Sequence, residues 1–172
     1  MELVDLYNEN RLPLGKTGER REARLPGEYQ MIVHVCVFNS KGQMLIQRRS
    51  EEKLLWAGLW DVSVAGGVDA GESSRQAAER EFREELGFSL GLGDKRPTFT
   101  LHIPKGFDDY YVLEQDIDLD SLSLQREEVS EVRWADRNEV LKLLEDGLFV
   151  PYHPLYMDLL FAVHSGEPVI KR

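Results

Sequence analysis

The sequence predicts an α/β (α+β) fold, with a mixed central β-sheet and helices on its faces. Runs of β-branched residues bounded by turn residues alternate with segments of helical period, and a glycine-rich loop leads directly into a helix. With 172 residues, 42% hydrophobic and 30% charged, the chain has the size and composition of one folded domain with its own core. We therefore expect a single domain over residues 1–172, made of an N-terminal strand and extended loop (1–28) and a core (29–172).

The order of the expected elements follows from local patterns. Strands are predicted over residues 3–7, 29–38, 44–47, 62–64, 98–103, 110–114 and 129–134. Residues 8–27 are polar and broken by glycines and prolines, so we expect a long loop there. Helices are predicted from Ser73–Ser74 to about residue 86, from Asp136 as N-cap to about residue 145, and over 154–163.

The glycine-rich loop (residues 66–72) and the helix after it carry the clearest chemical signal. One stripe of this helix is apolar, with residues four apart: Ala78, Phe82 and Leu86. A neighbouring stripe carries three glutamates at i, i+3 and i+4: Glu81, Glu84 and Glu85. Like charges at this spacing repel. Either Arg80 and Arg83 offset that repulsion on a solvated helix face, or the glutamates form a site for a hard cation such as Mg²⁺.

The wider spacing favours the metal site. The pattern is Gly66-x5-Glu72-x7-Arg80-Glu81-Phe82-x-Glu84-Glu85-x-Gly87-Phe88, and it matches the signature of the Nudix family at every specified position. The chain therefore resembles a Nudix protein. This resemblance implies the Nudix fold, an α/β/α sandwich, over roughly residues 29–159, and a divalent cofactor, Mg²⁺ with Mn²⁺ as the alternative.

The resemblance also implies roles for individual residues. Its metal-binding carboxylates correspond to Glu81, Glu84 and Glu85, with Glu81 as the first choice for the base and the other two as alternatives. The backbone carbonyl of Gly66 corresponds to a further metal ligand. Glu72 and Arg80 resemble the pair that ties the loop to the helix and orients the carboxylates.

Composition limits the partners. The net charge is -10, from 21 Lys and Arg against 31 Asp and Glu, which argues against binding to nucleic-acid polymers or anionic membranes. A small phosphorylated substrate is compatible with this charge, because a metal and a few arginines supply local positive charge. Cys36 is the only cysteine, which excludes an intrachain disulfide, and the first residues resemble no export signal. We expect a cytoplasmic protein, either a monomer or a homodimer.

The flanking residues resemble one branch of the family, the isopentenyl-diphosphate isomerases and their hydrolase-like relatives. The likeness is carried by residues 38–45, Arg48–Arg49, Trp60, Glu128–Val129 and residues 134–136. In the isomerases a cysteine supplies essential acid–base chemistry, and Ala65 stands at the corresponding position here. A methyl group cannot transfer a proton, so isomerase activity is not expected.

Residues outside the signature are further candidates for substrate binding and for an additional metal ligand. Arg48, Arg49 and Trp60 are candidates for substrate binding, because arginine binds phosphate oxygens and an aromatic ring stacks on a base; Trp56 is a second aromatic candidate, although packing is the more usual role. Four acids are candidates for an additional metal ligand: Asp108, Asp109, Glu128 and Glu131. His34 and Cys36 are expected in the core.

The sequence therefore predicts a metal-dependent pyrophosphohydrolase. It would cleave a diphosphate linkage in a nucleoside diphosphate linked to a group X, or in a nucleoside di- or triphosphate, by attack of water on phosphorus. The alternatives are an isopentenyl-diphosphate isomerase-like enzyme and a non-catalytic nucleotide-binding protein.

Overall fold

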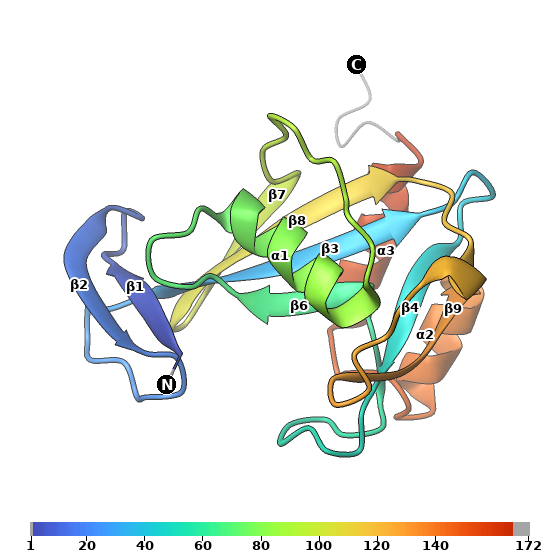
Figure 1. The fold of residues 1–172 in the computed structure, drawn as a ribbon, viewed down its shortest axis with the longest axis horizontal. Coiled ribbons are helices and arrows are strands. Elements are labelled where there is room, and N and C mark those ends of the chain that lie inside the picture. Colours follow the sequence, from blue (N-terminus) through green and yellow to red (C-terminus); the bar gives the residue numbers. More distant parts are fainter. Residues whose placement is uncertain (1, 167–172) are drawn as a thin grey trace.

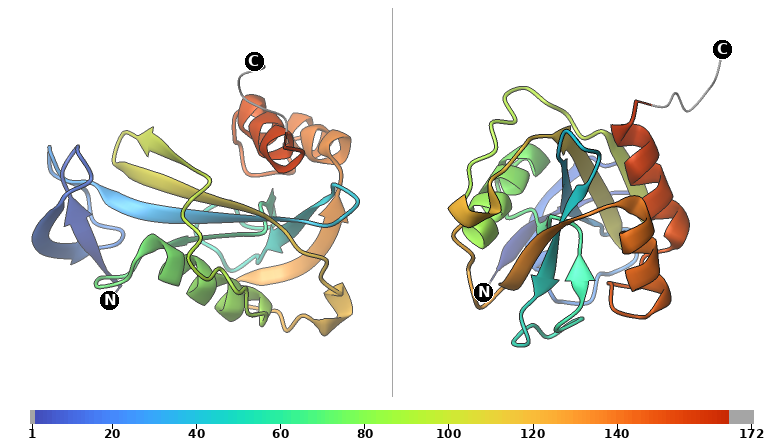
Figure 2. Two further views of the ribbon diagram at one scale, coloured as in Figure 1. Left: turned by 90° about the horizontal axis from the view of Figure 1, so that it is seen from above. Right: turned by 90° about the vertical axis from the view of Figure 1, so that its right-hand side faces the viewer.

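A central β-sheet lies between one helix on one face and two helices on the other, in a computed structural model that describes residues 2–166 (Figures 1 and 2). The strands are β1 (Leu3–Tyr7), β2 (Pro13–Glu19), β3 (Gln30–Phe38), β4 (Met44–Arg49), β5 (Trp60–Asp61), β6 (Val64–Gly67), β7 (Phe99–Ile103), β8 (Gly106–Glu114) and β9 (Val129–Ala135). The helices are α1 (Ser74–Leu86), α2 (Arg137–Glu145) and α3 (Pro154–His164), with a short 3₁₀ turn at Leu119–Ser121. The predicted α/β/α sandwich with a mixed sheet is confirmed.

The main sheet has seven strands and is built around β3. Its order is β5-β4-β3-β8-β7, with β6 also paired to β3 and β9 also paired to β4. The β3–β8 pair is parallel and the other pairs are antiparallel, so the sheet is mixed. One edge of β3 is shared by two strands. Near its end this edge pairs with β4, only at Phe38 and Met44, and along residues 32–35 it pairs with β6.

The sheet opens where β4 and β6 separate, and one buried serine joins the two sides. The Ser63 hydroxyl accepts a hydrogen bond from the Val37 amide at 2.9 Å and donates one to the Leu45 carbonyl at 2.6 Å.

Two apolar cores lie on opposite faces of the sheet. Alternate residues of β3 divide between them, with Val33, Val35 and Val37 facing the α1 core and Cys36 and Phe38 facing the α2–α3 core. The apolar stripe of α1 is fully buried in the first core, as predicted: Ala78, Phe82 and Leu86. Burial of this stripe fixes the rotation of α1 about its axis and therefore the direction of the glutamate stripe beside it.

The ends of α1 follow the predicted signals. Ser73 is the N-cap, and its side chain and that of Gln76 form a reciprocal capping box. Gly87 ends the helix with φ of 67°, a left-handed conformation that glycine adopts without strain. The start of α2 at Asp136 and the positions of α2 and α3 also agree with the prediction.

The prediction of a long loop over residues 8–27 is wrong in part. Residues 13–19 form β2, which pairs with β1 as a separate two-stranded sheet, called here the N-terminal hairpin (Leu3–Glu19). Nearly every residue of β2 is exposed, so the strand has no alternation of apolar and polar residues from which it could be recognised. Its backbone ladder with β1 holds it instead. The predicted strand at 62–64 is also displaced, because the structure places strands on either side of residues 62–63.

The expected core positions of His34 and Cys36 are confirmed, since both are buried. No helix in the described range, 2–166, combines the length and apolar character needed to cross a bilayer.

Candidate active site

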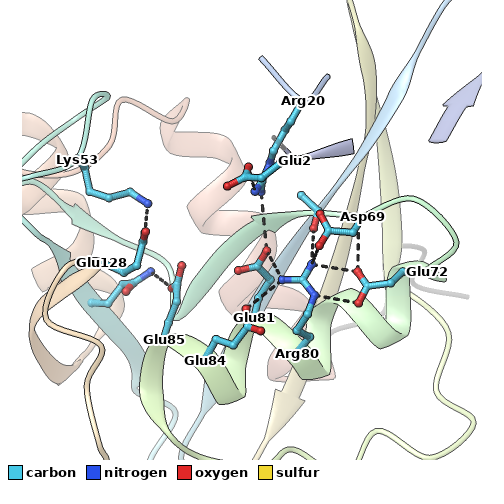
Figure 3. A network of polar contacts seen from close by, with 12 residues as sticks. Glu2, Arg20, Lys53, Asp69, Glu72, Arg80, Glu81, Glu84, Glu85 and Glu128 are labelled. Carbon is cyan, nitrogen blue, oxygen red and sulfur yellow. Dashed lines mark hydrogen bonds and ion pairs between the residues drawn. The ribbon is translucent and has the colours of Figure 1, made fainter. Parts of the chain in front are cut away.

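Helix α1 presents its three glutamates to different surroundings (Figure 3). Glu81 and Glu85 are buried, one helical turn apart, on the side of α1 that faces β6 and β4. Glu84 is turned outward, with 49% of its side chain exposed against 10% for Glu81. The structure therefore brings two of the three predicted metal ligands together and leaves the third at the edge of the site.

Arg80 organises the segment around the glutamates. Its Nε and Nη2 atoms donate to the two carboxylate oxygens of Glu72, at 2.8 and 3.0 Å, and Nη2 also donates to the Gly67 carbonyl at 3.0 Å. Its Nη1 atom lies 3.1 Å from Glu84 and 2.9 Å from Glu81. Although burial opposes it, the hydrogen bonds from Arg80 hold the pKa of Glu72 below its usual range, and Glu72 in turn raises the pKa of Arg80. The arginine therefore joins the glycine-rich loop to α1.

Gly66 makes room for the carboxylate of Glu81. A Cβ atom built on Gly66 would overlap the Glu81 carboxyl group, so only glycine lets that carboxylate lie directly against the β6 backbone. Burial raises the pKa of Glu81, while the positive charges of Arg80 and Arg20 oppose that rise. The position of Gly66 next to the first of the candidate carboxylates thus has a direct steric reason.

Glu85 is buried and forms no ion pair within the described residues. Its hydrogen-bond donor is Gln47 of β4, whose Nε2 lies 2.9 Å from Glu85 Oε2. Burial, reinforced by the negative charge of Glu81, raises the pKa of Glu85 to about 8. The side-chain oxygen of Gln47, Oε1, is buried and has no hydrogen-bond partner among the described residues. A cation close to Glu85 would supply the charge that the surrounding side chains do not.

Two cations near the glutamates were not predicted from the sequence. Lys53 forms an ion pair with Glu128, and burial together with the charge of Arg49 lowers the pKa of Lys53. Arg20, immediately after β2, reaches Glu81 with an N–O separation of 3.8 Å. Neither residue belongs to a recognisable motif. Four acids are candidates for an additional metal ligand, and Glu128 is the one that lies in this region, where it pairs with Lys53 (Figure 3).

The predicted substrate-binding residues lie on and beside the loop 50–59. Arg48 is partly exposed and donates to the Gly58 carbonyl at 2.9 Å, whereas Arg49 is largely buried and pairs with Asp61 at 3.2 Å. Trp60 stacks under the guanidinium of Arg133, with 4.9 Å from Cζ to the ring centroid. All three side chains have partners within the protein. Of the three, Arg49 is the one whose positive charge helps to lower the pKa of Lys53.

The other weighed residues are used elsewhere. Asp109 is fully buried and pairs with Arg11, and Asp108 lies 3.5 Å from His34 Nε2 on the opposite face of the sheet from α1. Glu131 is exposed. Trp56 is partly exposed at the tip of the loop, with φ of 54°.

The chemistry of the glutamate stripe fits a hard divalent cation, although the side chains do not yet form a complete coordination shell. Carboxylate oxygens are the ligands that Mg²⁺ and Mn²⁺ prefer, and Glu81 and Glu85 offer them next to the glycine backbone of β6. Within residues 2–166, no three His, Cys, Asp or Glu side chains converge as a ready metal site. Because Glu81 and Glu84 are engaged with arginine, binding of a cation would require these ion pairs to loosen.

Known proteins are similar to this chain in sequence and in fold. Residues 28–156 match the NUDIX domain. An uncharacterized Nudix hydrolase of Listeria monocytogenes is 46% identical over 169 residues, 98% of this chain and 99% of the relative. The crystal structure of DR0079 from Deinococcus radiodurans matches with a TM-score of 0.74 at 27% identity, covering 92% of this chain and 97% of that one. An isopentenyl-diphosphate Delta-isomerase of Pectobacterium atrosepticum is 40% identical over 98 residues, 57% of this chain and 52% of the relative.

Proposed function

The chain belongs to the Nudix family and is a hydrolase acting on phosphoric anhydrides, and on that premise we propose that it is a Mg²⁺-dependent pyrophosphohydrolase. Its substrates are nucleoside diphosphates linked to a group X, or nucleoside di- and triphosphates. Mn²⁺ is the alternative metal. The reaction is attack of water on one phosphorus of the diphosphate, which breaks the bond to the bridging oxygen and releases two phosphorylated products.

The observation that carries this proposal is the pair of buried glutamates, Glu81 and Glu85, because Glu85 has no ion-pair partner among the described residues and burial raises its pKa to about 8. Burying a carboxylate without a positively charged partner costs stability, and a cation bound beside it would offset that cost. When bound, a divalent ion supplies a Lewis acid for the diphosphate and lowers the pKa of water.

The proposed roles of the residues follow from their positions. Glu81 accepts the proton of the attacking water, because it is the acid that lies against Gly66 at the centre of the site, with Glu84 or Glu85 as the alternative base. Glu81, Glu84 and Glu85, with the Gly66 carbonyl, would supply the oxygen ligands of the metal. Arg80 holds the loop and helix in register through Glu72, so that the carboxylates keep their places during turnover.

The test is a panel of diphosphate compounds incubated with the purified protein and Mg²⁺, with products followed by mass. The panel includes nucleoside triphosphates, nucleotide sugars, dinucleotides and isopentenyl diphosphate. We expect cleavage between phosphates that requires the metal and is lost in the Glu84→Gln, Glu85→Gln double variant. The function would be refuted by undiminished metal-dependent cleavage in that double variant, or by no cleavage of any compound by the wild-type protein.

The isomerase alternative has a distinct outcome in the same panel. It predicts a product of unchanged mass from isopentenyl diphosphate, with no phosphate released. Ala65 stands where that reaction needs an acid–base group, and its methyl side chain cannot transfer a proton. The hydrolase is therefore the function that we propose.

A further inference from the structure

The N-terminal hairpin brings Arg20 to the edge of the candidate active site. The backbone amide of Arg20 donates to the Glu2 carbonyl at 2.9 Å, which continues the β1–β2 ladder by one residue. From there the side chain crosses Gly67, where a built Cβ atom would overlap the Arg20 guanidinium. Both Gly66 and Gly67 thus admit a charged side chain against the β6 backbone, a carboxylate at the first and a guanidinium at the second.

The guanidinium of Arg20 retains hydrogen-bond donors that the protein does not use. Its Nη1 atom donates to Glu2 at 2.9 Å, whereas Nη2 lies 3.8 Å from Glu81, which is too long for a hydrogen bond. Its Nε and Nη2 atoms donate to no residue in the described part of the chain. Arg80 differs, because all three of its guanidinium nitrogens are engaged with Glu72, Gly67, Glu84 or Glu81. Of the two arginines next to the glutamates, only Arg20 has free donors to offer a ligand.

The position of Arg20 is fixed by contacts between the hairpin and the rest of the fold. The Ala70 amide donates to the Leu3 carbonyl at 2.8 Å, and the Gly71 amide donates to Asp5 Oδ2 at 2.8 Å. The hairpin is therefore bonded directly to the glycine-rich loop that precedes α1. At the turn of the hairpin, Arg11 pairs with the fully buried Asp109 of β8. These contacts attach both ends of the hairpin to elements that also place the glutamates.

We propose that Arg20 is a substrate-binding residue, whose free guanidinium donors bind the diphosphate of the substrate beside Glu81. This assignment rests on the proposed function and adds a residue outside the Nudix signature to it. The planar guanidinium matches the spacing of phosphate oxygens, and Arg20 lies beside Glu81, one of the carboxylates that would hold the cation. The hairpin thus acts as part of the active site, and the segment 8–20 is not merely a connection to the core.

The experiment measures binding of imidodiphosphate, a diphosphate analogue that resists hydrolysis, to the full chain in saturating Mg²⁺ by calorimetry. Arg20→Gln is expected to weaken this binding by about 10- to 100-fold, the usual effect of losing charge-assisted hydrogen bonds. Arg20→Lys keeps the charge but not the fork, so its loss is expected to be smaller. The matched control is Arg21→Gln, since the neighbouring Arg21 is exposed and makes no ion pair within the described residues.

A second readout separates substrate binding from an effect on the metal. Because Arg20 places positive charge next to Glu81, its removal should leave the affinity for Mg²⁺ alone unchanged or raised. Weaker imidodiphosphate binding together with undiminished Mg²⁺ affinity supports the assignment. The assignment is overturned if wild type and Arg20→Gln bind imidodiphosphate with equal affinity. It is also overturned if Arg20→Gln and Arg21→Gln lose the same amount of affinity, or if the wild type does not bind imidodiphosphate at all.

The same preparations distinguish this inference from the proposed function. For any compound that the wild type hydrolyses, Arg20→Gln is expected to raise KM more than it lowers kcat, with partial recovery in Arg20→Lys. Hydrolysis by the wild type with an unaltered KM in Arg20→Gln refutes the role of Arg20 and leaves the function standing. Absence of hydrolysis across the panel, with imidodiphosphate binding that depends on Arg20, refutes the function and leaves the diphosphate contact standing.

Discussion

Replacement of Glu85 by glutamine is expected to stabilise the metal-free protein while removing its activity. The substitution keeps the shape of the side chain, and its carbonyl oxygen can still accept the hydrogen bond from Gln47. The new amide can also donate to the unpaired oxygen of Gln47. What disappears is a carboxyl group that must be buried either protonated or with an uncompensated charge.

The size of the effect follows from the pKa of Glu85, which burial raises from 4.5 to about 8. Because the pKa is higher in the folded state, the folded protein gains stability from this group below pH 4.5 and loses that gain as pH rises through 8. One pKa unit corresponds to about 1.36 kcal/mol. Relative to the fully protonated group at low pH, the Glu85 carboxyl therefore lowers the free energy of unfolding by about 1 kcal/mol at pH 5, about 3 at pH 7 and about 5 at pH 9. Glutamine does not titrate, so the advantage of Glu85→Gln should grow with pH by these amounts.

The assay is urea unfolding in EDTA at pH 5, 7 and 9, for wild type, Glu85→Gln and the exposed control Glu84→Gln. Saturating Mg²⁺ should reduce or reverse the advantage of Glu85→Gln, because a cation that binds the folded wild type stabilises it in proportion to its occupancy. An advantage that does not increase with pH, or one that Glu84→Gln shares, would refute the reasoning about buried charge.

Three further changes probe the rest of the site. Gly66→Ala should abolish Mg²⁺ binding measured by calorimetry, since the new Cβ would displace the carboxylate of Glu81. The control Gly91→Ala adds a Cβ in open space and should bind Mg²⁺ normally. Equal Mg²⁺ affinities of the two variants would contradict this reasoning. Arg80→Lys should lower kcat by at least about 10-fold, because one ammonium group cannot replace a guanidinium that joins the glycine-rich loop to α1. An unchanged kcat in steady-state kinetics would contradict this role of Arg80. Arg11→Gln should reduce the free energy of unfolding in urea by about 3 kcal/mol, because it leaves Asp109 buried without its cation; a loss near zero excludes this anchor.

Much of the fold could be predicted because its signals are local. The capping box at Ser73, the left-handed Gly87 and the apolar stripe of α1 each depend on residues within a few positions of one another. The buried strand β3 is apolar enough to be recognised by itself. The exposed strand β2 could not be found in this way, because its stability comes from backbone hydrogen bonds to β1 and not from an apolar face.

The site could be predicted only in part for a related reason. The spacing of the glutamates placed them on one stripe, but spacing alone does not show that Glu84 turns to Arg80 while Glu85 turns to Gln47 on another strand. Arg20 and Lys53 reach the site from separate loops, and nothing in their local sequence indicates the distance that the chain crosses. Contacts between remote segments therefore account for most of what the sequence left undetermined.

The most direct test of the central claim is a single time course with EDTA-treated protein and a diphosphate from the panel, run in ¹⁸O-labelled water, with Mg²⁺ added midway. We expect no cleavage before the addition and cleavage after it. One of the two phosphorylated products should carry one ¹⁸O atom, because water attacks phosphorus. Cleavage before Mg²⁺ is added, products without ¹⁸O, or an isomer of unchanged mass would contradict it.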